Sequence, residues 1–142
     1  MLADHVPHTT KVWDVVIPGE PQAWQRAGVG RGVHFTRTKT ARFEHAVALC
    51  ALAVQLPKGM RGPLLVSIMA VFERPKRLAR RDGARQYKAT KPDADNIAKG
   101  VLDGLKDHFH DAEVSDLHVH KRWAAEGERP HTHVEIRQLR EE

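Results

Sequence analysis

The hydrophobic positions of this chain change their spacing several times, and each spacing predicts an element. Residues 12–17 (VWDVVI) form a short β-branched run ended by a Pro-Gly pair, which is typical of a strand. From 40 to 55 the apolar residues recur at helical intervals, which predicts a helix with Phe43, Val47, Cys50 and Val54 on its buried face. Residues 63–72 (PLLVSIMAVF) form a continuous apolar run, which favours a strand buried on both faces.

The second half of the chain predicts one more helix and two more strands. Residues 97–108 place Ile97, Val101 and Leu105 on one helix face. Polar and apolar residues alternate from 114 to 123, and a turn at 127–130 leads into a last strand at 132–136, so we expect these two strands to pair as a hairpin. The glycine-rich segment 20–38 predicts a loop or loose hairpin.

This order predicts a two-layer α+β fold, with a mixed β-sheet packed against two main helices. The 142 residues suit a single domain over 1–142, with 1–11 and 138–142 as flexible tails. No apolar run approaches the roughly 20 residues of a membrane helix, and no secretion signal is evident. The single cysteine, Cys50, excludes an internal disulfide and suits a small buried hydrophobe. We therefore expect a cytoplasmic protein.

Charge indicates an anionic partner. Basic residues outnumber acidic ones by 23 to 18, a net charge of +5 that suggests nucleic acid or another anionic surface, although solubility alone could account for it. Eight of the basic residues lie between 73 and 91, which predicts a basic loop, although a charge run is also an ordinary solvated surface. With three arginines of the glycine-rich segment, they are the candidate DNA contacts: Arg26, Arg31, Arg37, Arg74, Lys76, Arg77, Arg80, Arg81, Arg85, Lys88 and Lys91.

Two aspartates, Asp93 and Asp95, stand where the second predicted helix begins. Pro92 favours an extended backbone just before them, and in an extended chain residues two apart point the same way. Two converging carboxylates suit a hard cation such as Mg²⁺. The alternative is that both are ordinary helix caps, because aspartate is favoured at helix N-termini.

Further polar candidates follow along this helix. Lys99 lies four residues after Asp95 and therefore on the same helix face. It is either half of an exposed ion pair or a cation that stabilises charge on a phosphate at the metal. Asp111 and Glu113 come after the helix and complete an acidic cluster in an otherwise basic protein.

Histidines and one tryptophan offer other chemistry. Two i,i+2 pairs of histidines on predicted strands have a spacing that can ligate zinc: His118 with His120, and His131 with His133. No cysteine accompanies them, which favours surface or hydrogen-bonded histidines. His110 differs because it adjoins Asp111, and Trp24, beside Arg26, could stack on a base.

The segments KPDADNIAKGVLDGL (91–105) and HDAEVSDLHVHKRW (110–123) resemble the signature of the RusA-type Holliday junction resolvases. That signature is a KPDxDN aspartate pair, a lysine four residues beyond its second aspartate, a VLDAL-like helix and a DDxQV-type segment opening a strand. IPGEPQAWQR and FTRTKTARFEHAV near the N-terminus are also similar to the family's layout, so the resemblance covers residues 12–137. It favours metal ligation over capping for the aspartate pair.

The resemblance implies a role for each matched position. Asp93 and Asp95 correspond to the family's paired metal-binding aspartates, Lys99 to its catalytic lysine, and Asp111 to its third catalytic and metal-binding carboxylate. His110 stands where the family usually has another aspartate, and Glu113 where glutamine is usual. His110 and Glu113 could each lie next to the metal ligands without binding the metal directly. We expect Glu113 to point to the same side of the strand as Asp111.

The implied protein is a homodimeric, Mg²⁺-dependent endonuclease of bacterial or phage origin that resolves Holliday junctions in DNA recombination and repair, with Mn²⁺ able to replace Mg²⁺. A two-fold dimer would present two sites to opposed strands of a four-way junction. A helix over 96–107 would rise roughly 18 Å, more than the roughly 14 Å that the next four residues can span. Either the helix is shorter, or Asp111 joins its partners in the other subunit.

Two other functions fit the same residues. A non-catalytic protein could bind branched DNA through the basic surface with a degenerate metal site, a hypothesis that His110 favours. A metal-binding protein could instead use the histidines. Cleavage in Mg²⁺ against EDTA separates the first from a nuclease, and zinc binding by a variant lacking His118 and His120 tests the second.

Overall fold

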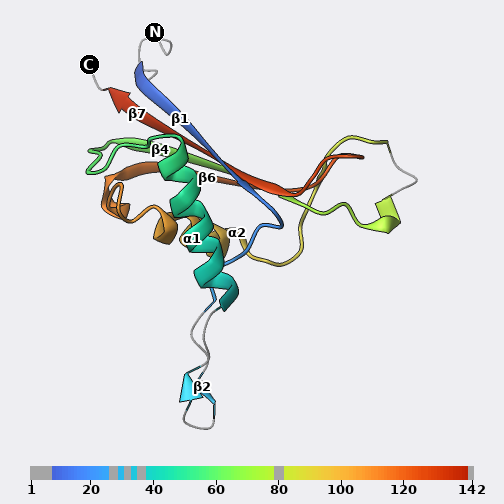
Figure 1. Ribbon diagram of the computed structural model, residues 1–142. Helices are drawn as coiled ribbons and strands as arrows, with labels where there is room; N and C mark the ends of the chain where they lie inside the picture. The colour runs from blue at the N-terminus through green and yellow to red at the C-terminus, as the bar shows by residue number, and fades with distance from the viewer. Residues whose placement is uncertain (1–7, 26–28, 31–32, 35–37, 79–81, 141–142) are drawn as a thin grey trace.

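The computed structural model describes residues 8–25, 29–30, 33–34, 38–78 and 82–140 (Figure 1). It confirms the predicted α+β fold with two helices, and the short η segments are 3-10 helices. The elements in chain order are β1 (His8–Pro18), β2 (Val29–Gly30), β3 (Val33–His34), α1 (Thr38–Ala53), β4 (Leu64–Phe72), η2 (Lys76–Leu78), β5 (Gln86–Tyr87), α2 (Ala94–Gly104), η3 (Asp111–Glu113), β6 (Val114–Trp123) and β7 (His131–Arg140).

Five of the described strands form one mixed sheet in the order β1-β7-β4-β6-β5, while β2 and β3 form the small hairpin expected after β1. Strand β4 is central, parallel to β6 and antiparallel to β7. The predicted β6–β7 hairpin is therefore wrong, because β4 lies between the two strands. The physical reason is burial: β4 is the most apolar strand, and Leu64, Val66 and Ile68 are fully buried only in the middle of the sheet.

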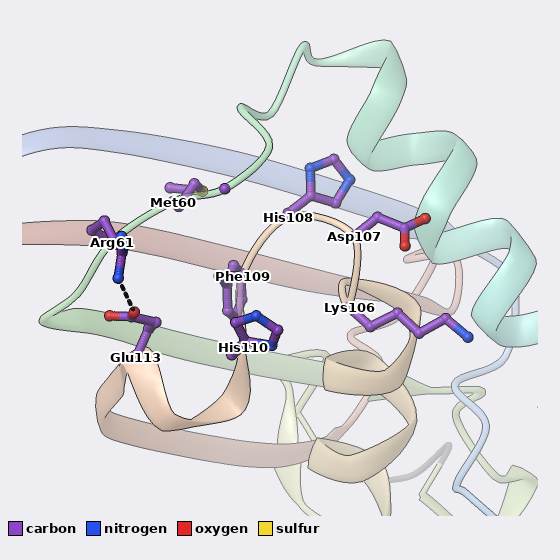
Figure 2. Close-up of a pocket in the computed structure, with 9 residues that line it drawn as sticks. Met60, Arg61, Lys106, Asp107, His108, Phe109, His110 and Glu113 are labelled. Carbon is purple, nitrogen blue, oxygen red and sulfur yellow. Dashed lines mark ion pairs between the residues drawn. The ribbon is translucent and has the colours of Figure 1, made fainter.

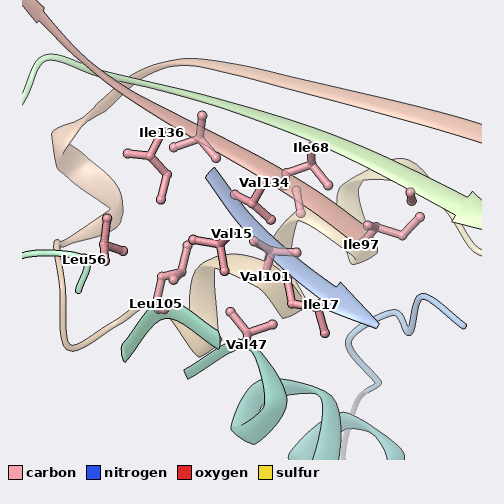
Figure 3. Packing of buried hydrophobic residues seen from close by; sticks show 14 of the residues in the cluster. Val15, Ile17, Val47, Leu56, Ile68, Ile97, Val101, Leu105, Val134 and Ile136 are labelled. Carbon is pink, nitrogen blue, oxygen red and sulfur yellow. The ribbon is translucent and has the colours of Figure 1, made fainter. Parts of the chain in front are cut away.

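Both helices lie on the same face of the sheet (Figure 1). The core fills the space between these two layers, and Figure 3 shows side chains from α1, α2, β1, β4 and β7 meeting there. In β4 the first six residues alternate between buried and half-buried, so one face of the strand is covered and the other is only partly shielded. The expectation that this strand is buried on both faces was wrong, because the helices cover one face.

Helix α1 buries a face that differs in part from the predicted one. Phe43 and Val47 are buried as expected, together with Thr40 and Ala51. Cys50 is only half-buried, and Val54 lies beyond the helix end with 42% of its surface exposed. The buried face of α1 therefore ends with Ala51, and not with the predicted Cys50 and Val54.

Helix α2 is shorter than predicted and ends at Gly104. This glycine packs against α1 so closely that an added Cβ would lie 2.7 Å from the Cβ of Val47. The chain then turns, Leu105 stays buried in the core, and the turn docks on the segment between α1 and β4 through a hydrogen bond of 2.7 Å from the N–H of Met60 to the carbonyl of His108.

The outer strands extend beyond their predicted limits. Strand β1 begins at His8 and β7 continues to Arg140, and the two pair along their length. Residues 8–11 and 138–140, which we expected in flexible tails, therefore belong to the sheet. In the described parts of the chain, no helix has the length and apolar character needed to cross a bilayer.

Candidate active site

The two aspartates at the start of α2 are exposed and little used by the fold. Asp93 occupies the N-cap with an extended backbone, and its carbonyl accepts the N–H of Ile97 at 3.2 Å, but its carboxylate makes no capping hydrogen bond. Asp95 accepts only the neighbouring N–H of Asn96, at 2.9 Å. Among the described residues, neither carboxylate takes part in an ion pair. Both are therefore available to a ligand, which the capping interpretation does not explain.

The segment that leads into Asp93 is held by Lys121 of β6. The Nζ of Lys121 donates to the carbonyl of Thr90 at 2.7 Å and to that of Pro92 at 2.9 Å. Sequence reasoning did not single out this lysine. The alternation along β6 could have revealed it, because Lys121 and Trp123 are two apart and therefore lie on the same face of the strand. A lysine on the helix-covered face of a sheet needs polar partners.

Lys88 holds the same segment before Asp93. Its position corrects the prediction that this lysine contacts DNA. The residue is 7% exposed, its Nζ donates to the hydroxyl of Thr90 at 2.6 Å and to the carbonyl of Lys91, and it lies 4.3 Å from the centroid of the Trp123 ring. Burial, followed by the nearby charge of Lys121, lowers the pKa of the Lys88 ammonium. Such a lysine supports the loop and does not face a phosphate.

Lys99 is held over an aromatic ring. Its Nζ lies 4.8 Å from the centroid of Trp24, within cation–π range. The backbone N–H of Trp24 donates to the carbonyl of Asn96 at 2.9 Å, which fixes the segment after β1 against the first turn of α2. The alternative ion pair with Asp95 is not formed in the described structure. This contact engages one face of the Trp24 ring, and stacking of the ring on a base remains a prediction.

Asp111 lies at the other end of α2 from the aspartate pair. It belongs to η3, which precedes β6, and the first residue of β6 pairs with Leu64. Lys121, which contacts Pro92, lies seven residues after the first residue of β6. At the rise of a β-strand this places Lys121 roughly 20 Å from the start of β6, where Asp111 lies. The shorter helix thus does not bring Asp111 to the pair. In the described residues there is no cluster of three His, Cys, Asp or Glu suited to a metal ion.

Glu113 is used by the fold. Its Oε2 accepts the N–H of Gly62 at 2.6 Å and its Oε1 lies 3.7 Å from Nη1 of Arg61, an ion pair drawn in Figure 2. An added Cβ at Gly62 would lie 2.2 Å from the Glu113 carbonyl oxygen, so this close approach requires glycine. Glu113 and Asp111 share the 3-10 helix η3, so the expectation that they share one side of a strand does not hold.

His110 precedes η3 and lines a pocket beside Glu113. The pocket has a volume of about 280 Å³ and is also lined by Arg61, Lys106 and His108 (Figure 2). His110 is exposed and makes no side-chain cap to η3. Its neighbours in this pocket include two cations, Arg61 and Lys106, whereas the aspartate pair is at the far end of α2.

Two arginines of the basic loop are also committed to the fold. The guanidinium of Arg74 donates to four backbone carbonyls, those of Leu78, Asp82, Ala84 and Ala124, at 2.7–3.2 Å. Arg85 forms a two-pronged pair with Glu128, with a shortest distance of 2.6 Å from Nη2 to Oε2. The guanidinium of Arg74 is therefore occupied within the chain, whereas Arg85 stays exposed beside Glu128 and its contact with DNA remains a prediction.

Three of the predicted DNA contacts are exposed and make no ion pair among the described residues: Lys76, Arg77 and Lys91. The guanidinium of Arg77 lies 5.6 Å from the centroid of the Trp123 ring, on the same aromatic side chain that covers Lys88. Five other arginines predicted to contact DNA lie outside the described residues: Arg26, Arg31, Arg37, Arg80 and Arg81.

The histidines are hydrogen-bonded or on the surface. The Nε2 of His133 lies 2.8 Å from Oδ1 of Asp14, and the Nδ1 of buried His108 lies 3.1 Å from the carbonyl of Pro57. His118 and His120 project from β6 with exposed and half-buried side chains. These contacts favour the structural interpretation over a zinc site.

Comparison with known proteins adds one finding. The family model described as Endodeoxyribonuclease RusA matches residues 18–137, which include β4, α2 and β6. No curated protein matches the chain significantly.

Proposed function

The chain belongs to the RusA endodeoxyribonuclease family, and from this premise we propose that it is a Mg²⁺-dependent enzyme that resolves Holliday junctions and related branched DNA in recombination and repair. The observation that carries the proposal is the pair of exposed carboxylates of Asp93 and Asp95. Asp93 makes no capping hydrogen bond, and Asp95, one helical turn before Lys99, accepts the N–H of its neighbour Asn96. Ordinary caps would be hydrogen-bonded to the helix, whereas a nucleolytic site needs acceptors left open to a cation.

The donor set fits a hard divalent cation. Mg²⁺ binds through one or two carboxylates together with phosphate oxygens and water, and Asp93 and Asp95 supply two such carboxylates at neighbouring positions. When bound, Mg²⁺, or Mn²⁺ in its place, would activate water and neutralise charge on the scissile phosphate. The residues that would hold it are Asp93, Asp95 and Asp111, the last of which lies too far away within one chain.

This separation supports a homodimer with shared sites. In a two-fold dimer, Asp93 and Asp95 of one subunit would face the partner's Asp111, and each dimer would contain two such sites. A four-way junction also has two-fold symmetry, so two sites related by the axis would act on opposed strands. Of the two explanations that the sequence leaves open for the position of Asp111, the geometry supports the second.

The chain's own side chains have distinct roles in this proposal. Lys99, held by Trp24 on the helix face of Asp95, offsets the charge that develops on the phosphate. Lys121 keeps the segment before Asp93 in place through its two carbonyl contacts. Lys76, Arg77 and Lys91 contact the phosphate backbone, with the five arginines outside the described residues as further proposed contacts.

The carboxylates provide the test. We expect Asp93→Asn, Asp95→Asn and Asp111→Asn each to slow cleavage of a synthetic four-way junction by about 100-fold or more, because each removes charge and a ligand from the cation. Binding of the junction, measured by gel shift in EDTA, should be unchanged or tighter.

Asp103→Asn is the matched control, because Asp103 lies on the same helix and has no proposed role at the cation. Its cleavage rate should stay close to that of the unmodified chain. Near-normal cleavage by all three test variants would contradict the site. An unmodified chain that binds junctions but cuts them no faster in Mg²⁺ than in EDTA would favour the non-catalytic binding function.

A further inference from the structure

Tyr87 is an exposed aromatic side chain at the edge of the sheet. It is the only tyrosine of the chain and lies on β5, the outermost strand beside β6. The residue is 81% exposed, more than any other large hydrophobic residue in the described part of the chain. A single exposed apolar residue can be ordinary surface, so its surroundings decide whether the ring has a ligand.

The ring is supported on one side by Arg122 of β6. The two residues are directly opposite each other in the β5–β6 pair, and the guanidinium carbon lies 4.2 Å from the ring centroid. Nη1 of Arg122 in turn donates to the carbonyl of Lys121 at 2.9 Å, which restrains the guanidinium. This cation–π contact covers one face of the ring, and the high exposure of Tyr87 leaves the other face open.

A flat, open ring face among cations suits a nucleobase. Every base has a π-face that can stack on an aromatic side chain, and neighbouring cations attract the phosphates on either side of that base. Besides Arg122, the exposed side chains of Arg85 and Lys91 lie two residues before and four residues after Tyr87. An apolar side chain of a protein partner would instead need an apolar surrounding, which these three basic residues do not provide.

Tyr87 also lies close to the proposed active site. The next residue, Lys88, and Lys121 of β6 both bind the segment 90–92, which leads into Asp93. Asp93 follows Tyr87 by six residues, so their Cα atoms are at most roughly 22 Å apart. Stacked nucleotides rise about 3.4 Å each, so a base on the ring would lie within about six nucleotides of a phosphate at Asp93.

We propose that Tyr87 stacks on a base at the branch point of the DNA, where Arg122 supports the ring. The inference rests on the proposed function, because it names the feature of branched DNA that this residue recognises. In a continuous duplex each base already stacks on its neighbours, so the ring meets no free base face. At a branch point the stack is interrupted, and the tyrosine ring takes the place of the missing neighbour. The contact therefore favours junctions over duplexes.

Replacement of the ring gives the first test. Tyr87→Leu keeps an apolar side chain but removes the aromatic face, and loss of one base–aromatic stack lowers affinity by about 5- to 150-fold. We expect this loss for binding of a synthetic four-way junction in EDTA, while affinity for a duplex of the same sequence changes by less than about twofold. Tyr87→Phe retains the ring and should bind junctions as the unmodified chain does.

Leu49→Ala is the matched control, because Leu49 is an exposed apolar residue of α1 with no proposed DNA contact. Its affinity for the junction should be unchanged. Three results would overturn the stacking role of Tyr87: unchanged junction affinity in Tyr87→Leu, an equal loss of junction and duplex affinity in that variant, or a loss in Tyr87→Phe as large as in Tyr87→Leu.

Photo-crosslinking locates the contact on the unmodified chain. A junction that carries 5-iododeoxyuridine next to the branch point should crosslink to Tyr87 when the complex is irradiated in EDTA, and mass spectrometry of the digested complex identifies the residue. The same nucleotide in the middle of an arm should not crosslink to Tyr87. Absence of Tyr87 from the residues crosslinked at the branch point, for example a crosslink to Trp24 alone, would overturn the inference.

Cleavage separates this inference from the proposed function. A chain that cleaves junctions in Mg²⁺ but does not depend on Tyr87 for junction binding would leave the nuclease proposal intact and overturn the stacking role. A chain that crosslinks to the branch point through Tyr87 but does not cleave junctions in Mg²⁺ would support the stacking role and overturn the nuclease proposal. A chain that does not bind junctions would overturn both.

Discussion

Arg85 and Glu128 form a two-pronged ion pair that fastens the basic loop to the turn before β7. The contacts between Nε and Nη2 of Arg85 and the carboxylate measure 2.6–3.1 Å, and Glu128 also accepts the N–H of Ala125 at 2.9 Å. The hydrogen bonds from Arg85 hold the pKa of Glu128 at about 2, below its ordinary value of 4.5. A lowered carboxylate pKa means that the folded chain stabilises the charged form of Glu128.

This pair should contribute pH-dependent stability. The contribution is present above pH 4.5 and is lost as the pH falls towards 2, because the unfolded chain then takes up the proton first. Arg85→Gln should lower the free energy of unfolding at pH 7 by on the order of 1 kcal/mol, as for a partly exposed pair. We expect the difference from the unmodified chain to shrink when urea unfolding is repeated at successively lower pH.

The matched control is Arg61→Gln. Arg61 pairs with Glu113 at a longer distance of 3.7 Å and is 86% exposed, so its removal should have a smaller effect at neutral pH. A stability difference for Arg85→Gln that is the same at every pH would contradict the role assigned to this pair.

At the level of single residues, the sequence predicts which side chains carry charge but not which charges are free. Arg74 and Lys88 are among the basic residues of one loop, yet one donates to four carbonyls and the other is buried against an aromatic ring. These partners are distant backbone groups and strands, which no local pattern encodes. Among the described residues of that loop, Lys76, Arg77 and Lys91 are predicted DNA contacts with exposed side chains, and Arg85 is exposed but paired with Glu128.

The basic segment between β4 and α2 can be tested through the salt dependence of binding. Replacing Lys76, Arg77 and Lys91 together with alanine should weaken junction binding and flatten the plot of log affinity against log salt. The slope should fall by about 0.9 for each phosphate that the variant no longer neutralises. The cleavage rate at saturating protein should change little, because these side chains position DNA and do not hold the cation.

Lys58→Ala is the control for this experiment, since Lys58 is an exposed lysine between α1 and β4 and has no proposed DNA contact. An unchanged affinity and slope in the triple variant would assign the loop to ordinary solvated surface.

At the level of elements, periodicity predicts the helices and the main strands but not their pairing. The short turn at 127–130 favours a hairpin, yet β4 enters between β6 and β7 because its continuous apolar run gains more from the centre of the sheet. The predicted end of α2 is wrong for a similar reason. Leu105 keeps the helical apolar spacing, but Gly104 already meets α1 and the chain must turn there.

At the level of the whole molecule, the family motif identifies the candidate site residues but does not by itself decide whether they act within one chain or, as we propose, across two. Asp93, Asp95 and Lys99 are close because they share one helix start, which the sequence predicts from spacing alone. Asp111 is close to them in the motif. In the fold it lies at the start of β6, whereas the segment before Asp93 contacts the end of that strand. The proposed function therefore depends on a dimer in which each site takes residues from both subunits.

Mixing two inactive variants tests the shared site most directly. Asp95→Asn and Asp111→Asn should each be inactive alone, but their heterodimer would contain one site with every proposed ligand intact. After equal mixing and subunit exchange, about a quarter of the normal number of sites would be restored, and junctions should be nicked at a corresponding level. A mixture of Asp93→Asn with Asp95→Asn should stay inactive, because both changes fall on the same side of the shared site. If the first mixture also stays inactive after heterodimers have been shown to form, the shared site is contradicted.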